Sequence, residues 1–300
     1  MTVKERIQSL KEKQNAIILA HYYVPDEVQD IADFIGDSFY LSKVASQTTA
    51  DTLILCGVSF MGESAKIINP DKKVLIPDPK ADCPMAHMAD IEKIKELRKQ
   101  YDDLAVVCYI NSTAELKKYS DVCVTSANAL NIVRALPNKH IFFVPDENLG
   151  KYVASQIPEK HFIFNDGRCP IHAGLTADTL LAAKKAHPEA QILIHPECTP
   201  DTLKLADYIG STSGIIRYAT ESPSNSFIIC TENGVMHELM KKNPDKKFYI
   251  ADETLCCPGM KRITLKKVLD VLEHQNNAVT LDDQLCRESM ISLERMLELG

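Results

Sequence analysis

The chain has 300 residues, of which 45% are apolar and 25% charged, with ten cysteines and no tryptophan. This composition is typical of a globular protein of about two domains, and it excludes collagen-like, disordered and disulfide-scaffold proteins. The net charge of −7 argues against nucleic acid as the main partner, and no apolar run approaches the roughly 18 residues of a membrane span. Because the amino terminus lacks the apolar core of a signal peptide, we expect a cytoplasmic protein in which clustered cysteines bind metal rather than pair.

The sequence repeats itself with a period of about 87 residues, half the 174-residue offset between the outer copies. Two segments show the repeat, each in a first, a middle and a last copy: Asn69–Lys73, Ile157–Lys160 and Asn243–Lys247; Ala32–Ser38, Ser120–Ser126 and Ala206–Thr212. The middle copies are degenerate but in register. Several matches at one period predict three homologous units.

Each unit has the same order of predicted elements. The first strands are Ala16–Ala20, Leu104–Cys108 and Gln191–Ile194, and after a helix the second strands end just before Ser38, Ser126 and Ser211. The third strands are Thr52–Val58, His140–Val144 and Ser226–Cys230. The helices that follow contain Glu63–Ile68, Leu149–Gln156 and Val235–Lys242, and the fourth strands are Lys73–Ile76, His161–Phe164 and Lys247–Ile250.

Short apolar strands that alternate with helices predict an α/β fold with parallel sheets covered on both faces. We therefore expect three pseudo-equivalent three-layer α/β/α domains, each with a parallel four-stranded sheet, around a central cavity. The expected domains are residues 1–86, 87–172 and 173–261. The C-terminal segment 262–300 contains two further predicted helices, Thr264–His274 and Leu281–Leu299. We expect this segment to pack on the first domain.

Polar side chains follow the predicted strands at the ends where parallel sheets bind ligands. The first strands are followed by His21-Tyr22-Tyr23, Tyr109-Ile110-Asn111-Ser112 and His195-Pro196-Glu197-Cys198, and the second strands by Ser38, Ser126 and Ser211-Thr212. Any one of these residues could be a buried polar group or a helix cap. Their repetition in three units predicts convergence on one site, where hydroxyls and helix N-termini can bind carboxylate or phosphate.

Three cysteines, Cys83, Cys169 and Cys257, precede proline and are spaced 86 and 88 residues apart, each after the fourth strand of its unit. Three thiolates from distant segments suit a metal centre with an open position, which could be catalytic zinc or an iron–sulfur cluster. Three sulfur ligands favour the cluster, because catalytic zinc usually has histidine or carboxylate ligands. The remaining cysteines are expected in the core (Cys56, Cys108, Cys123, Cys230), in the last helix (Cys286), or have no assigned role (Cys198, Cys256).

The chain resembles the quinolinate synthase family over essentially its whole length. The motifs that carry the resemblance are His21-x-Tyr23, Gly36-Asp37-Ser38, Cys83-Pro84-Met85-Ala86, Tyr109-x-Asn111-Ser112, Thr125-Ser126-Ala127-Asn128, Cys169-Pro170-Ile171-His172, His195-Pro196-Glu197-Cys198, Gly210-Ser211-Thr212 and Cys257-Pro258-Gly259-Met260-Lys261. The resemblance implies three α/β/α domains and a [4Fe–4S] cluster held by three cysteines. It also implies condensation of iminosuccinate with dihydroxyacetone phosphate to quinolinate, phosphate and water in NAD biosynthesis, with transient contact with the enzyme that supplies iminosuccinate.

The resemblance also implies roles for single residues. The iron without a protein ligand would act as a Lewis acid, and Glu197 beside His195 would be the main general acid/base. His21, Tyr23 and Tyr109 would move protons or orient the substrates. The remaining substrate-binding residues would be Ser38, Ile110, Asn111, Ser126, His172, Pro196, Ser211 and Thr212.

Three positions depart from the family pattern or leave a choice open. Tyr22 stands where asparagine is common, Arg168 stands where histidine is common, and Cys256 adjoins Cys257. The shared Cys-Pro motif favours Cys257 as the third cluster ligand.

Other functions fit the same residues. A three-thiolate zinc or iron–sulfur (de)hydratase could act on another small anionic substrate, and a zinc hydrolase would be colourless and active in air. An iron–sulfur sensor would need a protein or nucleic-acid surface, and the acidic sequence has no basic stripe. A metal-free sugar-phosphate enzyme would make the Cys-Pro repeat accidental.

Overall fold

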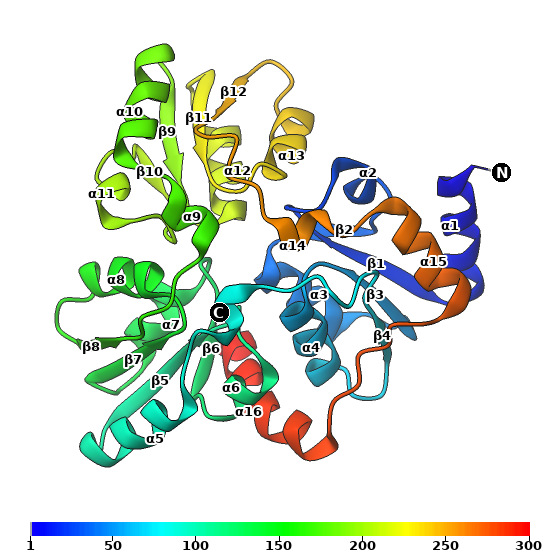
Figure 1. Ribbon diagram of the computed structural model, residues 1–300, viewed down its shortest axis with the longest axis horizontal. Helices are drawn as coiled ribbons and strands as arrows, with labels where there is room; N and C mark the ends of the chain where they lie inside the picture. Colours follow the sequence, from blue (N-terminus) through cyan, green and yellow to red (C-terminus); the bar gives the residue numbers. More distant parts are fainter. Residues whose placement is uncertain (1) are drawn as a thin grey trace.

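The computed structural model describes residues 2–300 and contains three parallel sheets of four strands each. Their strand orders are β2-β1-β3-β4, β6-β5-β7-β8 and β10-β9-β11-β12, which is one topology repeated three times. Helices cover the sheets, and the three units surround a common centre (Figure 1). The expected α/β fold with three similar α/β/α units is therefore confirmed.

The elements follow the same order in each unit. The first unit contains α1 (Val3–Lys13), β1 (Ala16–His21), α2 (Asp26–Gln29), β2 (Phe34–Gly36), α3 (Ser38–Gln47), β3 (Thr52–Cys56), α4 (Ser59–Ile68), β4 (Lys73–Leu75) and the 3₁₀ helix η1 (Pro84–His87). The second contains α5 (Ile91–Gln100), β5 (Leu104–Tyr109), α6 (Ala114–Lys118), β6 (Val122–Val124), α7 (Ala129–Ala135), β7 (His140–Val144), α8 (Glu147–Ser155), β8 (His161–Phe164) and α9 (Pro170–Gly174). The third contains α10 (Ala177–Ala186), β9 (Gln191–Ile194), α11 (Pro200–Leu203), β10 (Tyr208–Ile209), α12 (Thr212–Glu221), β11 (Ser226–Cys230), α13 (Val235–Lys242), β12 (Lys247–Ile250) and α14 (Pro258–Lys261). Two helices, α15 (Leu265–His274) and α16 (Asp283–Leu299), complete the chain.

The central strands are apolar because helices cover both faces of each sheet. Every residue of β3, β5 and β11 is buried, as expected for parallel strands with no solvent-facing side. One hydrogen bond recurs in all three units and sets the same connection between the first and second strands. The carboxylates of Asp33, Asp121 and Asp207 each accept a backbone N–H of the first strand at 2.7 Å.

Element ends differ from the prediction by one or two residues, for local reasons. The third strand of the first unit stops at Cys56, because Val58 already serves as the N-cap of α4. The last helix begins at Asp283 rather than Leu281, because the Asp282 carboxylate caps it by accepting the N–H groups of residues 284 and 285.

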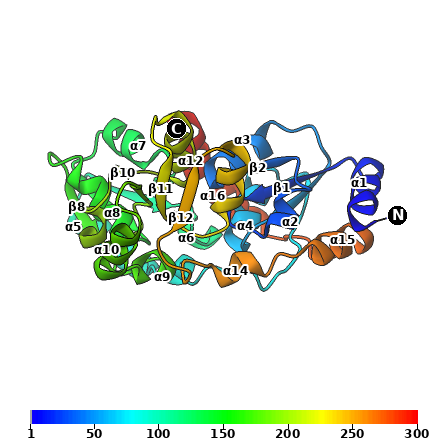
Figure 2. The ribbon, with the colours of Figure 1, turned by 90° about the horizontal axis from the view of Figure 1, so that it is seen from above.

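The two C-terminal helices pack in different places. Helix α15 lies against α1 and α2 of the first unit, whereas α16 lies against α6 and β6 of the second unit as well as α4 of the first (Figures 1 and 2). Ser289 and Ser292 on α16 donate hydrogen bonds to the carbonyls of Ala114 and Lys117 on α6. Helix α16 therefore joins two units instead of belonging to the first alone. Among the described residues, no helix is long and apolar enough to cross a membrane.

Candidate active site

A central cavity lies where the carboxyl ends of the strands of all three units meet. Residues from the first-strand ends, the second-strand ends and the Cys-Pro motifs line it together. The predicted site residues that line it are His21, Tyr23, Ser38, Cys83, Tyr109, Asn111, Ser126, Cys169, His172, His195, Glu197, Thr212 and Cys257. The sequence repeat thus brings together groups that lie more than 200 residues apart in the chain.

Three predicted substrate-binding residues do not line this cavity. Ile110 and Pro196 are buried beside lining residues, and Ile110 belongs to the hydrophobic core. The Ser211 hydroxyl caps α12 by accepting the N–H of Gly214 at 3.1 Å. The strand-end pattern thus selected segments that reach the cavity, but these three side chains lie in other environments.

The three Cys-Pro cysteines occupy equivalent structural positions. Each is the N-cap of a short helix whose first residue is the proline: Cys83 before η1, Cys169 before α9 and Cys257 before α14. Backbone N–H groups of the following turn approach each sulfur and favour its thiolate form. Burial nevertheless raises the pKa of all three thiols, that of Cys83 to about 12, and the neighbouring thiols add to the increase for Cys83 and Cys169.

Two acidic side chains, Asp146 and Glu232, hold the backbone of two of these cysteines. The sequence analysis did not identify either acid. The N–H of Cys169 donates to Asp146 at 2.9 Å, and the N–H of Cys257 donates to Glu232 at 2.9 Å. Glu232 also pairs with Lys261 Nζ at 2.8 Å. Asp146 and Glu232 each lie two residues beyond a third strand, at strand ends that the sequence analysis did not consider.

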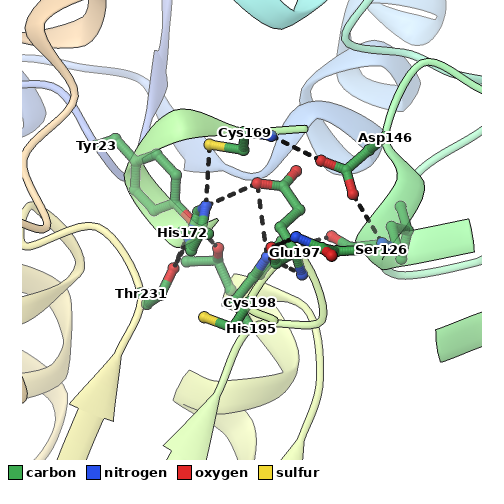
Figure 3. Close-up of polar contacts among 12 residues, drawn as sticks. Tyr23, Ser126, Asp146, Cys169, His172, His195, Glu197, Cys198 and Thr231 are labelled. Atoms are coloured by element: carbon green, nitrogen blue, oxygen red, sulfur yellow. Dashed lines mark hydrogen bonds and ion pairs between the residues drawn. The ribbon is translucent and has the colours of Figure 1, made fainter. Parts of the chain in front are cut away.

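Glu197 lies beside two histidines of the cavity, His172 and His195 (Figure 3). Its Oε2 lies 2.7 Å from Nδ1 of His172 and 3.9 Å from Nδ1 of His195, and it accepts a hydrogen bond from the Tyr109 hydroxyl. Burial alone would raise the pKa of Glu197, but the His172 contact and the hydrogen bonds outweigh burial and hold the pKa below its ordinary value. The carboxylate therefore stays ionised in a site that is only 3% exposed.

Hydroxyl groups and histidines form a second contact chain from the first unit to the third. The Tyr23 hydroxyl lies 2.6 Å from the Thr212 hydroxyl and 2.7 Å from that of Thr231. The Thr231 hydroxyl in turn lies 2.9 Å from Nε2 of His172, which is the opposite side of the ring from the Glu197 contact. The His21 ring packs edge-on against Tyr23, with 4.5 Å between ring centroids. These contacts connect Tyr23, through Thr231, to the imidazole ring that contacts Glu197.

Burial keeps two of the cavity histidines neutral. It lowers the pKa of His21 and of His195 to about 3, even though the Glu197 charge acts in the opposite direction. The imidazole of His195 lies 3.2 Å, through Nε2, from the Ser126 hydroxyl. Neutral imidazoles can both donate and accept hydrogen bonds, which suits substrate oxygens of either kind.

Neither of the serines at two second-strand ends is the N-cap of the helix that follows it. The Asp37 carboxylate accepts the Tyr40 N–H as the cap of α3, so Ser38 occupies the first helical position. In the second unit the Asn128 side chain accepts the N–H of Thr125 and closes the turn that contains Ser126. Both serines line the cavity at a helix or turn rich in N–H donors, a setting that binds anions.

The donor set fits a metal centre. Cys169 Sγ, a ring nitrogen of His172 and a Glu197 oxygen lie within 4.8 Å of one another, close enough to hold one metal ion. The three helix-capping thiols also suit an iron–sulfur cluster, because they reach one cavity from three directions and N–H groups approach each sulfur. All ten cysteines are free, including Cys198, whose thiol faces the Cys230 carbonyl, and the partly exposed Cys256.

The departures from the expected family pattern point away from the cavity. Arg168 is exposed and pairs with Asp166 at 2.7 Å, and Tyr22 lies in an outer groove and not among the cavity residues. Neither Arg168 nor Tyr22 therefore takes part in the lining of the cavity.

Comparison with known proteins gives consistent results along the chain. The sequence model of one protein family, described as "NadA: Quinolinate synthetase A protein", matches residues 5–298. A protein named quinolinate synthase from Fusobacterium nucleatum is 51% identical over 298 residues, covering 99% of both chains. Proteins of the same name are 50% identical in a Sulfurihydrogenibium species, over 99% of this chain and 98% of the relative, and 49% identical in Methanosarcina barkeri, over 98% and 96%.

Proposed function

Because the chain belongs to the NadA quinolinate synthetase family, we propose that it condenses iminosuccinate with dihydroxyacetone phosphate to give quinolinate, phosphate and water. The observation that carries this proposal is one cavity in which three equivalent cysteines face a buried Glu197 and its histidine and tyrosine partners. Forming an aromatic ring from two small molecules requires several proton transfers and the loss of water, and this cavity holds groups suited to both.

In this proposal Cys83, Cys169 and Cys257 hold a [4Fe–4S] cluster. When bound, such a cluster supplies a Lewis-acidic iron without a protein ligand. The N-cap position of each cysteine and the proline that follows fix the direction of the sulfur. Asp146 and Glu232 act as positioning residues, because they hold the backbone N–H groups of two of the cysteines.

Glu197 is the proposed proton acceptor for the C–H and N–H protons that leave as the ring forms. His172 fixes one carboxylate oxygen at 2.7 Å, and the Tyr109 hydroxyl donates a further hydrogen bond, so the carboxylate is oriented before the substrate binds. The Asn148 side chain holds the Glu197 carbonyl at 3.0 Å and fixes the backbone. Tyr23 and His172 share Thr231, which provides a path for a proton to leave the carboxylate.

The substrates are anions, and the chain has a net charge of −7, so local donors must bind them. Ser38, Ser126, Thr212 and Asn111 supply hydroxyl and amide donors on the side of the cavity formed by second-strand ends and the adjacent turn. The Asn111 Oδ1 is buried without a protein partner among the described residues, which leaves it available for a substrate donor. Phosphate and carboxylate groups would bind here, and we propose that the reacting carbons lie between these donors and Glu197.

A metal ion on Cys169, His172 and Glu197 is the second candidate, since this mixed donor set is also suited to catalytic zinc. Anaerobic purification followed by metal and sulfide analysis separates the two. Iron and acid-labile sulfide in a brown protein that makes quinolinate from the two substrates support the proposal. A colourless zinc protein, or a brown protein that makes no quinolinate, would refute it.

A further inference from the structure

A ring of three chain segments separates the central cavity from a groove on the protein surface. In each unit one residue faces the cavity and the next lines the groove. The pairs, cavity residue first, are Ser38 and Phe39, Ser126 and Ala127, and Thr212 and Ser213. Asp37 lines both spaces. Because all three units contribute to the ring, the groove lies over the middle of the cavity.

The cysteine-bearing helices lie on the opposite side of the molecule from this ring. In Figure 2, α3, α7 and α12 occupy the upper side, and α9 and α14, which follow Cys169 and Cys257, occupy the lower side. A metal centre on the three cysteines would fill the lower end of the cavity. A molecule that approaches from the groove would therefore meet the anion-binding hydroxyls first and the metal centre last.

Two cations stand at the groove, although the whole chain is acidic. Lys43 on α3 and Lys242 on α13 line it, and both are exposed. Lys242 Nζ lies 2.9 Å from Glu238, whereas Lys43 makes no ion pair within residues 2–300. The third charged group is Asp37, whose carboxylate accepts hydrogen bonds from the Ser213 hydroxyl at 2.5 Å and from the Tyr40 N–H. The Asp37–Ser213 bond joins the first unit to the third across the ring.

We propose that this groove is the port through which anionic substrates reach the cavity, that Lys43 and Lys242 attract them, and that the Asp37–Ser213 hydrogen bond closes it. The proposal rests on the proposed function only for the charge of the substrates. A phosphate ester carries close to two negative charges at neutral pH, and the −7 net charge of the protein would slow its approach elsewhere. Local cations at a port raise the association rate, and salt weakens this effect.

The test compares the holoenzyme with its Lys43→Ala/Lys242→Ala variant. Binding of dihydroxyacetone phosphate alone is followed by stopped-flow tyrosine fluorescence, because Tyr23 and Tyr109 line the cavity and the chain has no tryptophan. At low ionic strength the association rate constant should fall by about tenfold, and at 0.5 M salt, where the Debye length is about 4 Å, the two proteins should converge. The single variant Lys242→Ala is compared with Lys241→Ala as its matched control, because Lys241→Ala removes the same single charge from the preceding residue of α13, which does not line the groove.

The second variant tests closure. Ser213→Ala removes the hydrogen bond to Asp37, and we expect association and dissociation to accelerate together, by about threefold or more, with an unchanged ratio, because the Ser213 side chain does not line the cavity. Unchanged rates in Ser213→Ala would overturn the closing role. An association rate constant that is unchanged in the lysine variants, or that Lys241→Ala lowers as much as Lys242→Ala does, would overturn the role of the groove as the port. Neither result depends on turnover, so a holoenzyme that binds the phosphate ester but makes no quinolinate refutes the proposed function alone.

Discussion

Replacing Glu197 with glutamine tests the catalytic core of the site. Glutamine has nearly the same shape, so the cavity keeps its packing, but the side chain can no longer accept a proton. The two contacts that hold the carboxylate, from His172 at 2.7 Å and from the Tyr109 hydroxyl, change from charge-assisted to neutral hydrogen bonds. The cysteines are untouched, so the metal centre should assemble normally.

The expected loss of rate follows from these contacts. Exchanging a charge-assisted hydrogen bond for a neutral one costs about 1 kcal/mol, so two contacts account for about 2 kcal/mol, or about 30-fold. Loss of a positioned general base costs about 10² to 10⁴ in rate. Because both effects act through one carboxylate they are not independent, and we expect kcat to fall by about 10³.

The assay is quinolinate formation by anaerobically prepared enzyme, with iron content measured on the same sample. Glu63→Gln serves as the control, because the Glu63 carboxylate accepts the Ala114 N–H at 2.8 Å outside the cavity. We expect this control to keep its activity. A Glu197→Gln enzyme with full iron content and a kcat within about threefold of the unmodified protein would refute the assigned role.

Three further substitutions test other parts of the structure. Cys169→Ser should lower iron and sulfide per chain, and a variant with a full cluster would exclude Cys169 as a ligand. Tyr109→Phe removes one hydrogen bond to Glu197 and should reduce kcat by about tenfold with the cluster intact; an unchanged kcat would contradict that contact. Asp78→Asn removes the partner of Lys267 Nζ at 2.7 Å and of the half-exposed Arg262 at 3.0 Å, and should lower the free energy of unfolding by about 1–2 kcal/mol at pH 7. Burial raises the pKa of Asp78, but its hydrogen bonds and the two cations outweigh burial, so the folded pKa lies below the ordinary value. The stabilisation by these ion pairs is therefore complete above the unfolded pKa of about 3.9 and is lost as pH falls through the folded pKa. Urea unfolding at pH 7 and at pH 3 should therefore show that the difference in free energy of unfolding between the two proteins is smaller at pH 3. An equal difference at both pH values would contradict the ion pair.

The repeat made the fold predictable from the sequence. A strand seen weakly in one unit gains support when equivalent residues in the other two units show the same pattern. The constant spacing between the first strand and Asp33, Asp121 or Asp207 corresponds in the structure to one hydrogen bond that recurs at 2.7 Å. The sequence therefore contains three observations of each repeated element, and within the repeated units the errors lie at element ends.

The position of α16 could not be predicted in the same way. Its apolar stripe indicates that one face is buried, but no second copy of this helix exists to show what covers it. The deciding contacts are hydrogen bonds from Ser289 and Ser292 to carbonyls of α6. Serine is common at exposed and buried helix positions alike, so its sequence pattern does not identify a partner helix.

Cavity residues were predicted at strand ends that are polar in all three units. They were missed at strand ends where one unit has an apolar residue. Asp146 and Glu232 are equivalent to Val58 in the first unit, which is apolar and caps α4 with its backbone. With one of the three copies apolar, this strand end does not stand out as polar. Thr231 contacts both Tyr23 and His172, and it follows a cysteine at the end of a buried strand, where sequence gives no sign of a polar role.

The threefold repeat also explains how a near-symmetric scaffold can support an unsymmetric reaction. The proposed cluster ligands are the same residue in each unit, and each is the N-cap of a short helix that begins with proline. At one position just beyond the first strands, however, the equivalent residues are Tyr23, Asn111 and Glu197, so one unit supplies the carboxylate, one an amide and one a phenol. Duplication therefore places three side chains at one centre, and divergence at this single equivalent position gives them different chemistry. Exchanging Asn111 and Glu197 in a double variant should keep the fold and the cluster yet abolish turnover, because the carboxylate would leave its contacts with His172 and Tyr109.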